Sequence, residues 1–208
     1  PVCVTSNGAA LYDSAEDRVM SAHELSPAAL AEVVDVAQTV LGTVGFGAER
    51  AGGSLADAVE DLFVVERHYS ENALFEGFGV VSMGELVGQP AVKFLIRNTD
   101  YSAPELYELI APHIDPELAH LTYSMQEGIL EVAAPNVTKR RGVEWLAQHT
   151  GVAQQETIAF GDMPNDIEML RWAGCGVAME NAHPEVKAAA DAVTVANHQA
   201  GVAKVLER

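Results

Sequence analysis

The chain has 208 residues and a mass of 22.1 kDa, which is enough to bury a core as one domain or as two modest ones. It carries 12 lysine and arginine residues against 30 aspartate and glutamate residues, so its net charge of −18 argues against binding to nucleic acid. No apolar run is long enough to span a bilayer and no basic, apolar leader is present, so we expect a cytoplasmic protein without a membrane partner. The two cysteines, Cys3 and Cys175, lie in apolar, strand-like stretches and are expected to be reduced core thiols.

The first half of the chain reads as a mixture of short strands and helices. Residues 1–12 predict two strands around a Ser6-Asn7-Gly8 turn, and the acidic residues 13–24 predict a loop or hinge. Ser26 and Pro27 predict the start of a helix whose apolar residues recur at helical spacing as far as Leu41. The elements expected next are strands near 43–50, 62–67 and 91–97, a loop over 68–79 and a helix over 104–114.

The second half alternates more cleanly. A hairpin over 121–124 and 128–133 precedes a helix over 139–149 that Thr138 caps. The elements expected after it are strand 157–160, helix 164–173, strand 175–178, helix 184–190, strand 192–195 and a terminal helix from about 201. Strands that alternate with helices at this spacing predict a parallel sheet with helices on its faces.

These patterns predict an α/β protein with a discontinuous organisation. Residues 1–21 and 128–208 are expected to form a Rossmann-like core, and residues 22–127 an inserted α+β module.

A group of polar residues follows the predicted strand 157–160. Asp162 comes directly after Gly161, and Asn165 and Asp166 follow within four residues, where a helix begins. An isolated Gly-Asp is most simply a turn with a helix cap, and Asp166 is favourable near a helix N-terminus in its own right. The full G-D-x-x-N-D spacing after a buried strand instead indicates a site for Mg²⁺ and phosphate.

Lys139 lies in the first turn of a predicted helix, where the positive end of the helix dipole disfavours a cation. The alternatives are a solvated surface lysine and a lysine held there by an anion; with G-D-x-x-N-D downstream we favour the anion. The seven histidines show no i, i+4 pair, so a zinc site is not expected. His68, Tyr69, Glu71 and Asn72 gather polar and aromatic groups in one segment, for which a solvated loop is the simpler interpretation.

Three segments carry a family resemblance: SNGA at 6–9, GDMPND at 161–166 and GVAMENAHPEVKAAAD at 176–191. With the Lys139 helix and a middle segment of about a hundred residues, they resemble the Cof-type branch of the haloacid dehalogenase-like hydrolases, whose inserted module is a cap domain. The resemblance implies a Mg²⁺-dependent phosphatase that acts on small phosphorylated metabolites through an aspartyl-phosphate. It implies catalytic roles for Lys139 and Asp162, phosphate or substrate binding by Lys139, Asn165 and Asn7, and metal binding by Asp162, Asp166 and Asn165.

The chain departs from the family in one respect. The family's D-x-D-G-T nucleophile segment and the Ser or Thr of the next strand are missing, since no two Asp residues lie two positions apart and Asp-Gly never occurs. We expect both segments upstream of Pro1, with a degenerate enzyme as the alternative, and negligible turnover by these residues alone. Strand 157–160 should then keep an unpaired edge. A phosphomutase and a catalytically inactive binding module remain alternatives, and neither the substrate nor the oligomeric state is predicted.

Overall fold

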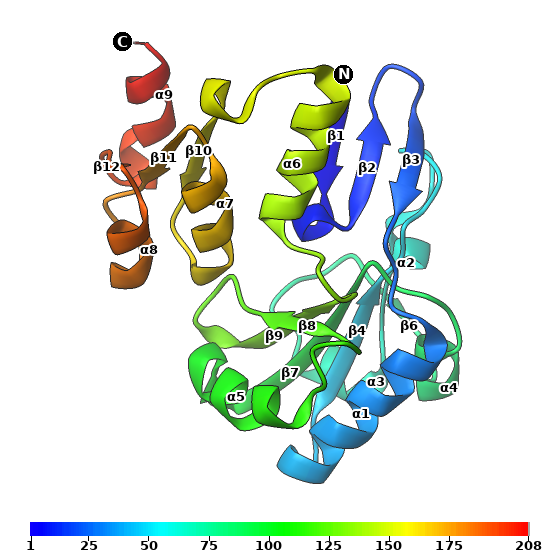
Figure 1. The fold of residues 1–208 in the computed structure, drawn as a ribbon. Coiled ribbons are helices and arrows are strands. Elements are labelled where there is room, and N and C mark those ends of the chain that lie inside the picture. Colours follow the sequence, from blue (N-terminus) through cyan, green and yellow to red (C-terminus); the bar gives the residue numbers. More distant parts are fainter. Residues whose placement is uncertain (208) are drawn as a thin grey trace. The chain divides into compact units, whose positions relative to one another are not determined.

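The computed structural model describes residues 1–207, and the chain is of the α/β class (Figure 1). It divides into two compact units, one spanning Pro1–Val137 and the other beginning at Thr138. This division groups residues 1–21 with the segment that follows them, so the discontinuous core suggested by the sequence stays a prediction. Within the described residues, no helix is both long enough and apolar enough to cross a membrane.

A small antiparallel sheet opens the first unit. Its strands are β1 (Val2–Thr5), β2 (Ala10–Asp13) and β3 (Arg18–Ala22), in that order. The expectation of a loop throughout 13–24 was wrong, because β3 pairs with β2 from Arg18 to Ala22. The expectation that Cys3 is a core thiol was also wrong, because β1 is an edge strand whose alternate residues are exposed, Cys3 among them.

The larger sheet of this unit has six strands in the order β6-β5-β4-β7-β9-β8. Its central strands, β4, β7 and β9, pair antiparallel, and β6 pairs parallel with β5 at one edge. The strands are β4 (Gly45–Glu49), β5 (Phe63–Val65), β6 (Gly79–Val80), β7 (Lys93–Ser102), β8 (His120–Thr122) and β9 (Glu127–Ala133). The hairpin expected near 121–133 is confirmed as β8 and β9.

Three helices pack on one face of the six-stranded sheet: α1 (Pro27–Leu41), α4 (Met83–Val87) and α5 (Ala103–Ile110). Helix α1 contacts both of the others, and Figure 1 shows α1 and α5 on the same side of the sheet. The core between them includes Leu30, Phe46, Phe94, Leu106 and Leu130, all with 0% exposure. This burial of the apolar face supplies the main stabilisation of the unit.

The opposite face carries the short helix α3 (Arg67–Glu71), where the sequence predicted a loop. The helix forms because the carboxylate of Glu66 accepts hydrogen bonds from the backbone N–H groups of His68 and Tyr69. Tyr69 is 1% exposed and lies against Gly45 of β4, where a Cβ atom would meet the tyrosine backbone at 2.8 Å. A further single turn, α2 (Val59–Leu62), precedes β5.

The second unit contains a parallel sheet in the order β10-β11-β12, with strands β10 (Ile158–Gly161), β11 (Cys175–Ala178) and β12 (Ala192–Val193). Its helices are α6 (Lys139–Thr150), α7 (Ile167–Trp172), α8 (Pro184–Ala189) and α9 (Gly201–Leu206), and a 3₁₀ turn, Pro164–Asp166, precedes α7. Leu170 of α7 and Val186 of α8 pack with Ala178 in its core. The alternation of strands and helices predicted for this part of the chain is confirmed.

Strand β10 has one free edge, because among the described strands it pairs only with β11. An apolar hollow of about 430 Å³ lies at β10 between α6 and α7, and its lining includes Leu146, Phe160 and Trp172. Ile158 of β10 is 43% exposed. The unpaired edge expected for this strand is therefore confirmed.

Candidate active site

Asp166 organises the turn at the carboxyl end of β10. Its Oδ2 accepts hydrogen bonds from the backbone N–H groups of Asp162, at 2.9 Å, and of Met163, at 3.1 Å. The residue is 4% exposed, and these bonds satisfy two donors that the strand can no longer pair. The turn that carries Asp162 is therefore held from inside by the carboxylate of Asp166.

Gly161 makes this arrangement possible. A Cβ atom at this position would collide with the Cβ of Asp166 and would lie 2.9 Å from its Oδ2. Only glycine leaves room for the Asp166 side chain to fold back under the end of β10.

Lys139 meets the same carboxylate. Its Nζ donates to Oδ1 of Asp166 at 2.6 Å, and the side chains of the two residues are 29% and 6% exposed. Thr138 caps α6 by accepting from the N–H of Arg141, so Lys139 is the first residue of the helix. The sequence favoured a lysine held here by an anion over a solvated surface lysine, and the carboxylate of Asp166 is such an anion.

Asp162 is held by the segment that follows β11. Its Oδ2 accepts from Nδ2 of Asn181 at 3.0 Å, and its main-chain carbonyl accepts from the N–H of His183. Asn181 in turn accepts from the N–H of Asn197. No hydrogen bond from the described residues reaches Oδ1 of Asp162. Sequence reasoning gave Asn181 no role, although its place just after the next parallel strand was a usable signal.

Asn165 has an unusual environment. Both its Oδ1 and its Nδ2 are buried, and neither has a hydrogen-bond partner in the described part of the chain. A buried amide without partners is costly, so a ligand at this point would stabilise it. An amide oxygen and a partly free carboxylate, three residues apart in one turn, are ligands that suit a hard cation such as Mg²⁺.

The set of candidate metal ligands is limited. Within residues 1–207 no group of three or more His, Cys, Asp or Glu residues is arranged to hold a metal. Both oxygens of Asp166 already accept hydrogen bonds. Asp162 and Asn165 therefore fit as ligands that need others to complete a shell, and the metal roles of all three residues stay predictions.

Asn7 lies in the first unit, whereas Lys139, Asp162, Asn165 and Asp166 lie together in the second. It adopts the left-handed conformation, with φ of 56°, in the turn after β1. Its Nδ2 donates to Oε2 of Glu131 at 3.0 Å, and Oε1 of Glu131 lies 3.7 Å from Nζ of Lys93. Asn7 is thus fixed to the six-stranded sheet, and its predicted role in substrate binding stays untested.

Comparison with known proteins gives consistent results. A family model described as haloacid dehalogenase-like hydrolase matches residues 1–206. The 5-amino-6-(5-phospho-D-ribitylamino)uracil phosphatase YitU of Bacillus subtilis is 29% identical over 160 residues, which cover 74% of this chain and 58% of the relative. YbjI of Escherichia coli, a phosphatase of the same name, is 41% identical over 116 residues, or 56% of this chain and 42% of the relative.

The same fold occurs in a solved structure, SMU.1108c from Streptococcus mutans. It superposes with a TM-score of 0.82 at 19% identity and covers 99% of this chain and 75% of that chain. The matches to the two named phosphatases cover 58% and 42% of their lengths, so this chain aligns with only part of either relative.

Proposed function

Because this chain belongs to the haloacid dehalogenase-like hydrolases, we propose that its protein is a Mg²⁺-dependent phosphatase acting on small phosphorylated metabolites. One observation carries the proposal beyond the family match: the buried, unpartnered amide of Asn165 lies three residues from Asp162, whose Oδ1 has no bond from the described residues. The ribityl phosphate in the names of YitU and YbjI supports a polyol or sugar phosphate as the substrate.

Asp162 and Asn165 would hold Mg²⁺ through a carboxylate and an amide oxygen, and Asp166 would support them by fixing the turn. The cation, when bound, would neutralise the phosphoryl oxygens. Asn181 keeps Oδ2 of Asp162 occupied, so that Oδ1 stays available. These roles use only contacts within the second unit.

Lys139 would bind the phosphoryl group of the substrate. Its Nζ has three N–H donors, one of which is taken by Asp166, so further donors remain for the oxygens of a phosphate. The ion pair with Asp166 holds the ammonium group at the turn. Because charge spreads over the equatorial oxygens in the transition state, a fixed ammonium group lowers the barrier to transfer.

The family resemblance implies an aspartate nucleophile, and we propose that it is neither Asp166, whose oxygens are engaged, nor Asp162, which we assign to the metal. By family resemblance, one aspartate attacks phosphorus, an O–P bond forms, and the ester O–P bond breaks while a second aspartate protonates the leaving oxygen. Water then hydrolyses the acyl phosphate and releases phosphate. We propose that a strand which adds to the free edge of β10 supplies both carboxylates.

A second candidate is a binding module without turnover, which the engaged carboxylate of Asp166 favours for residues 1–208 taken alone. A phosphomutase would use the same acyl phosphate but return the phosphoryl group to a sugar. We also propose a cytoplasmic location, which suits the free thiols Cys3 and Cys175, and no nucleic-acid partner, because of the net charge of −18.

The test is phosphate release by the full-length protein with Mg²⁺, measured on a panel of sugar phosphates, polyol phosphates, nucleotides and pyridoxal phosphate. We expect release from at least one polyol or sugar phosphate, loss of that release in Asp162→Ala, and negligible release by residues 1–208 alone. An isomerised sugar phosphate in place of free phosphate would identify a mutase. No product from any substrate would refute the proposal, and turnover by residues 1–208 alone would refute the assignment of the nucleophile to a further strand.

A further inference from the structure

Arg97, in the middle of β7, is a buried cation that has no carboxylate partner among residues 1–207. It is 6% exposed, and its Nε donates to the main-chain carbonyl of Asn72 at 2.7 Å. No carboxylate of the described residues lies within ion-pair distance of its guanidinium group, whereas Lys93 on the same strand lies 3.0 Å from Glu49. A guanidinium group taken out of water without a counter-ion is unfavourable.

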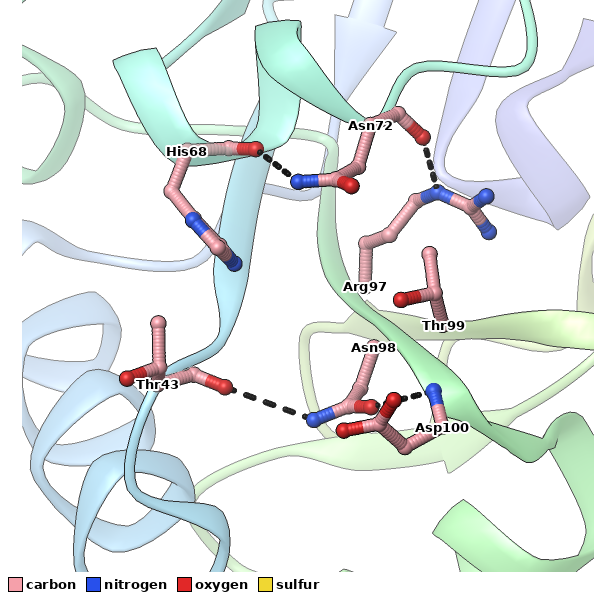
Figure 2. A pocket seen from close by; sticks show the side chains of 7 residues that line it. All are labelled: Thr43, His68, Asn72, Arg97, Asn98, Thr99 and Asp100. Carbon is pink, nitrogen blue, oxygen red and sulfur yellow. Dashed lines mark hydrogen bonds between the residues drawn. The ribbon is translucent and has the colours of Figure 1, made fainter.

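The bond to Asn72 explains only part of this arrangement. Asn72 is the C-terminal cap of α3, so Arg97 satisfies a carbonyl at the negative end of that helix. Figure 2 shows the two terminal nitrogens of Arg97 lying beyond this bond, and no hydrogen bond joins them to the other residues drawn. These nitrogens form the flat fork with which arginine binds carboxylates and phosphates.

Two hollows meet at this residue. The smaller, of about 140 Å³, is lined by Thr43, His68, Asn72, Arg97, Asn98, Thr99 and Asp100, and Figure 2 shows the imidazole of His68 pointing into it from α3. The larger, of about 390 Å³, shares Arg97, Thr99 and Asp100 and extends over Leu74 and Tyr101. Of the three described residues that line both hollows, Arg97 is the buried cation.

Some of the polar groups around the smaller hollow make hydrogen bonds within the described chain, and others do not. Nδ2 of Asn98 donates to the carbonyl of Thr43, and its Oδ1 accepts from the N–H of Asp100. Nδ2 of Asn72 donates to the carbonyl of His68. No hydrogen bond is present in the described chain for the imidazole of His68 or the hydroxyl of Thr99, so both remain available as donors beside Arg97.

We propose that Arg97 and Thr99 form an oxyanion site in the first unit, which binds the carboxylate or phosphate group of a small molecule. Arg97 and Thr99 belong to the first unit, whereas Lys139 and Asp162 belong to the second, and anion binding at Arg97 goes beyond the phosphatase activity proposed above. The fork of Arg97 holds the anionic group, and Thr99 adds a hydroxyl donor. The rest of the ligand lies over Leu74 and Tyr101, with Asp100 and Glu127 as acceptors for its hydroxyl or amino groups.

The experiment is a titration of the isotopically labelled chain with inorganic phosphate and, separately, with acetate, at constant ionic strength and without Mg²⁺. Backbone amide shifts report the place of binding. We expect saturable shifts at 68–72 and 97–101 with a dissociation constant on the order of millimolar. Shifts with one anion alone identify the group that the site prefers. Phosphate shifts confined to 139 and 162–166, together with no acetate shifts at 68–72 and 97–101, would refute the oxyanion site without affecting the proposed phosphatase.

Variants separate binding from a purely structural role of Arg97. Arg97→Gln should weaken binding at least tenfold, Arg97→Lys should weaken it because the fork is lost, and Thr99→Val should weaken it a few-fold without loss of fold. Arg67→Gln is the matched control, since it removes one positive charge from an exposed pair on α3, and it should leave the affinity within about twofold. If Arg97→Lys and Thr99→Val bind as the parent does, or if neither anion shifts these amides at tens of millimolar, Arg97 only caps α3 and the proposal is wrong.

Discussion

The Nζ of Lys139 lies 2.6 Å from Oδ1 of Asp166, and this contact joins the first residue of α6 to the turn after β10 across 27 positions of sequence. The same carboxylate, through Oδ2, holds the N–H groups of Asp162 and Met163. One side chain therefore orients the candidate metal ligand and the candidate phosphate-binding lysine together. A change at Asp166 should affect both.

Asp166→Asn tests this coupling. An amide oxygen can still accept from the N–H groups of Asp162 and Met163, but the ammonium group of Lys139 loses its counter-ion. We expect the free energy of unfolding to fall by about 2 kcal/mol. We also expect phosphate release by the full-length protein to fall at least a hundredfold, because Lys139 is no longer held in place. Urea denaturation and steady-state kinetics measure the two effects.

Glu144→Gln is the matched control for that variant. Glu144 forms ion pairs with Arg140 and Arg141 on the surface of α6. A surface ion pair of this kind contributes about 1 kcal/mol or less to stability. The control should change neither stability nor activity appreciably. Equal effects of the two substitutions would mean that the Lys139–Asp166 pair is an ordinary surface contact.

Asn165→Ala separates metal binding from folding. Because both amide atoms are buried and have no hydrogen-bond partner among residues 1–207, their removal should cost little stability in the absence of metal, about 0.5 kcal/mol or less. The affinity for Mg²⁺ should fall about tenfold, since an oxygen ligand is lost. Thermal unfolding with and without Mg²⁺ measures both quantities. An unchanged response to Mg²⁺ would remove Asn165 from the metal site.

Gly161→Ala should disrupt the turn although it removes no polar group. The added methyl group would occupy the space of the Asp166 side chain, so either the carboxylate or the end of β10 must move. We expect a loss of about 2 to 3 kcal/mol in stability, in the range for overpacking. Gly151→Ala is a useful comparison, because nothing lies within 4 Å of its added Cβ and its cost comes only from a φ of 73°. A smaller effect at Gly161 than at Gly151 would contradict the close approach.

Much of this fold could be predicted from the sequence. The alternation after Thr138 placed α6, β10, α7, β11 and α8 to within a few residues, because each element there has its own periodicity, cap or terminating glycine. The turns of α2, α3 and α4 are four or five residues long and carry no such periodicity. Helix α3 depends on Glu66, whose role as a cap becomes visible only when the backbone is folded.

The candidate site was predicted in part for a similar reason. G-D-x-x-N-D is a local pattern, so Asp162, Asn165 and Asp166 could be recognised from their spacing. The contacts of Asn181 with Asp162 and of Lys139 with Asp166 join residues 19 and 27 positions apart, and no local pattern encodes them. Arg97 gave no signal at all, because its burial without a counter-ion is a property of the folded sheet.

Glu66→Ala should be among the most destabilising single changes in the first unit. Its carboxylate is buried and accepts from the N–H groups of Phe46, His68 and Tyr69, at 3.0, 2.6 and 2.7 Å. Truncation leaves the donors of Phe46 and Tyr69 buried and unsatisfied, so we expect a loss of about 2 to 4 kcal/mol. Glu66→Gln should cost less, since it keeps one acceptor oxygen. Denaturant titration ranks the variants, and equal losses in both would show that the acceptor oxygens are not what stabilises α3.

The pair formed by Tyr12 and Asp17 should make stability depend on pH at both extremes. The hydrogen bond that Tyr12 donates to Asp17 raises the pKa of Tyr12 to about 12. Hydrogen bonds from the N–H of Leu55 and from the hydroxyl of Tyr12 lower the pKa of Asp17. Because the pKa of Asp17 is lower in the folded chain than its unfolded value of 3.8, the charged carboxylate stabilises the fold at pH values above 3.8. This stabilisation is lost as the pH falls through the lower, folded pKa.

The pKa of Tyr12 is shifted in the opposite direction, so the protonated phenol stabilises the fold. This stabilisation is complete at pH values below the unfolded pKa of 10.0 and disappears as the pH rises through about 12. Ultraviolet titration of tyrosinate, compared with Tyr12→Phe, isolates this group from the other tyrosines. In Asp17→Asn the transition should return towards 10, because the charged acceptor is gone. A transition that stays near 12 in Asp17→Asn would show that the hydrogen bond to Asp17 is not what raises the pKa of Tyr12.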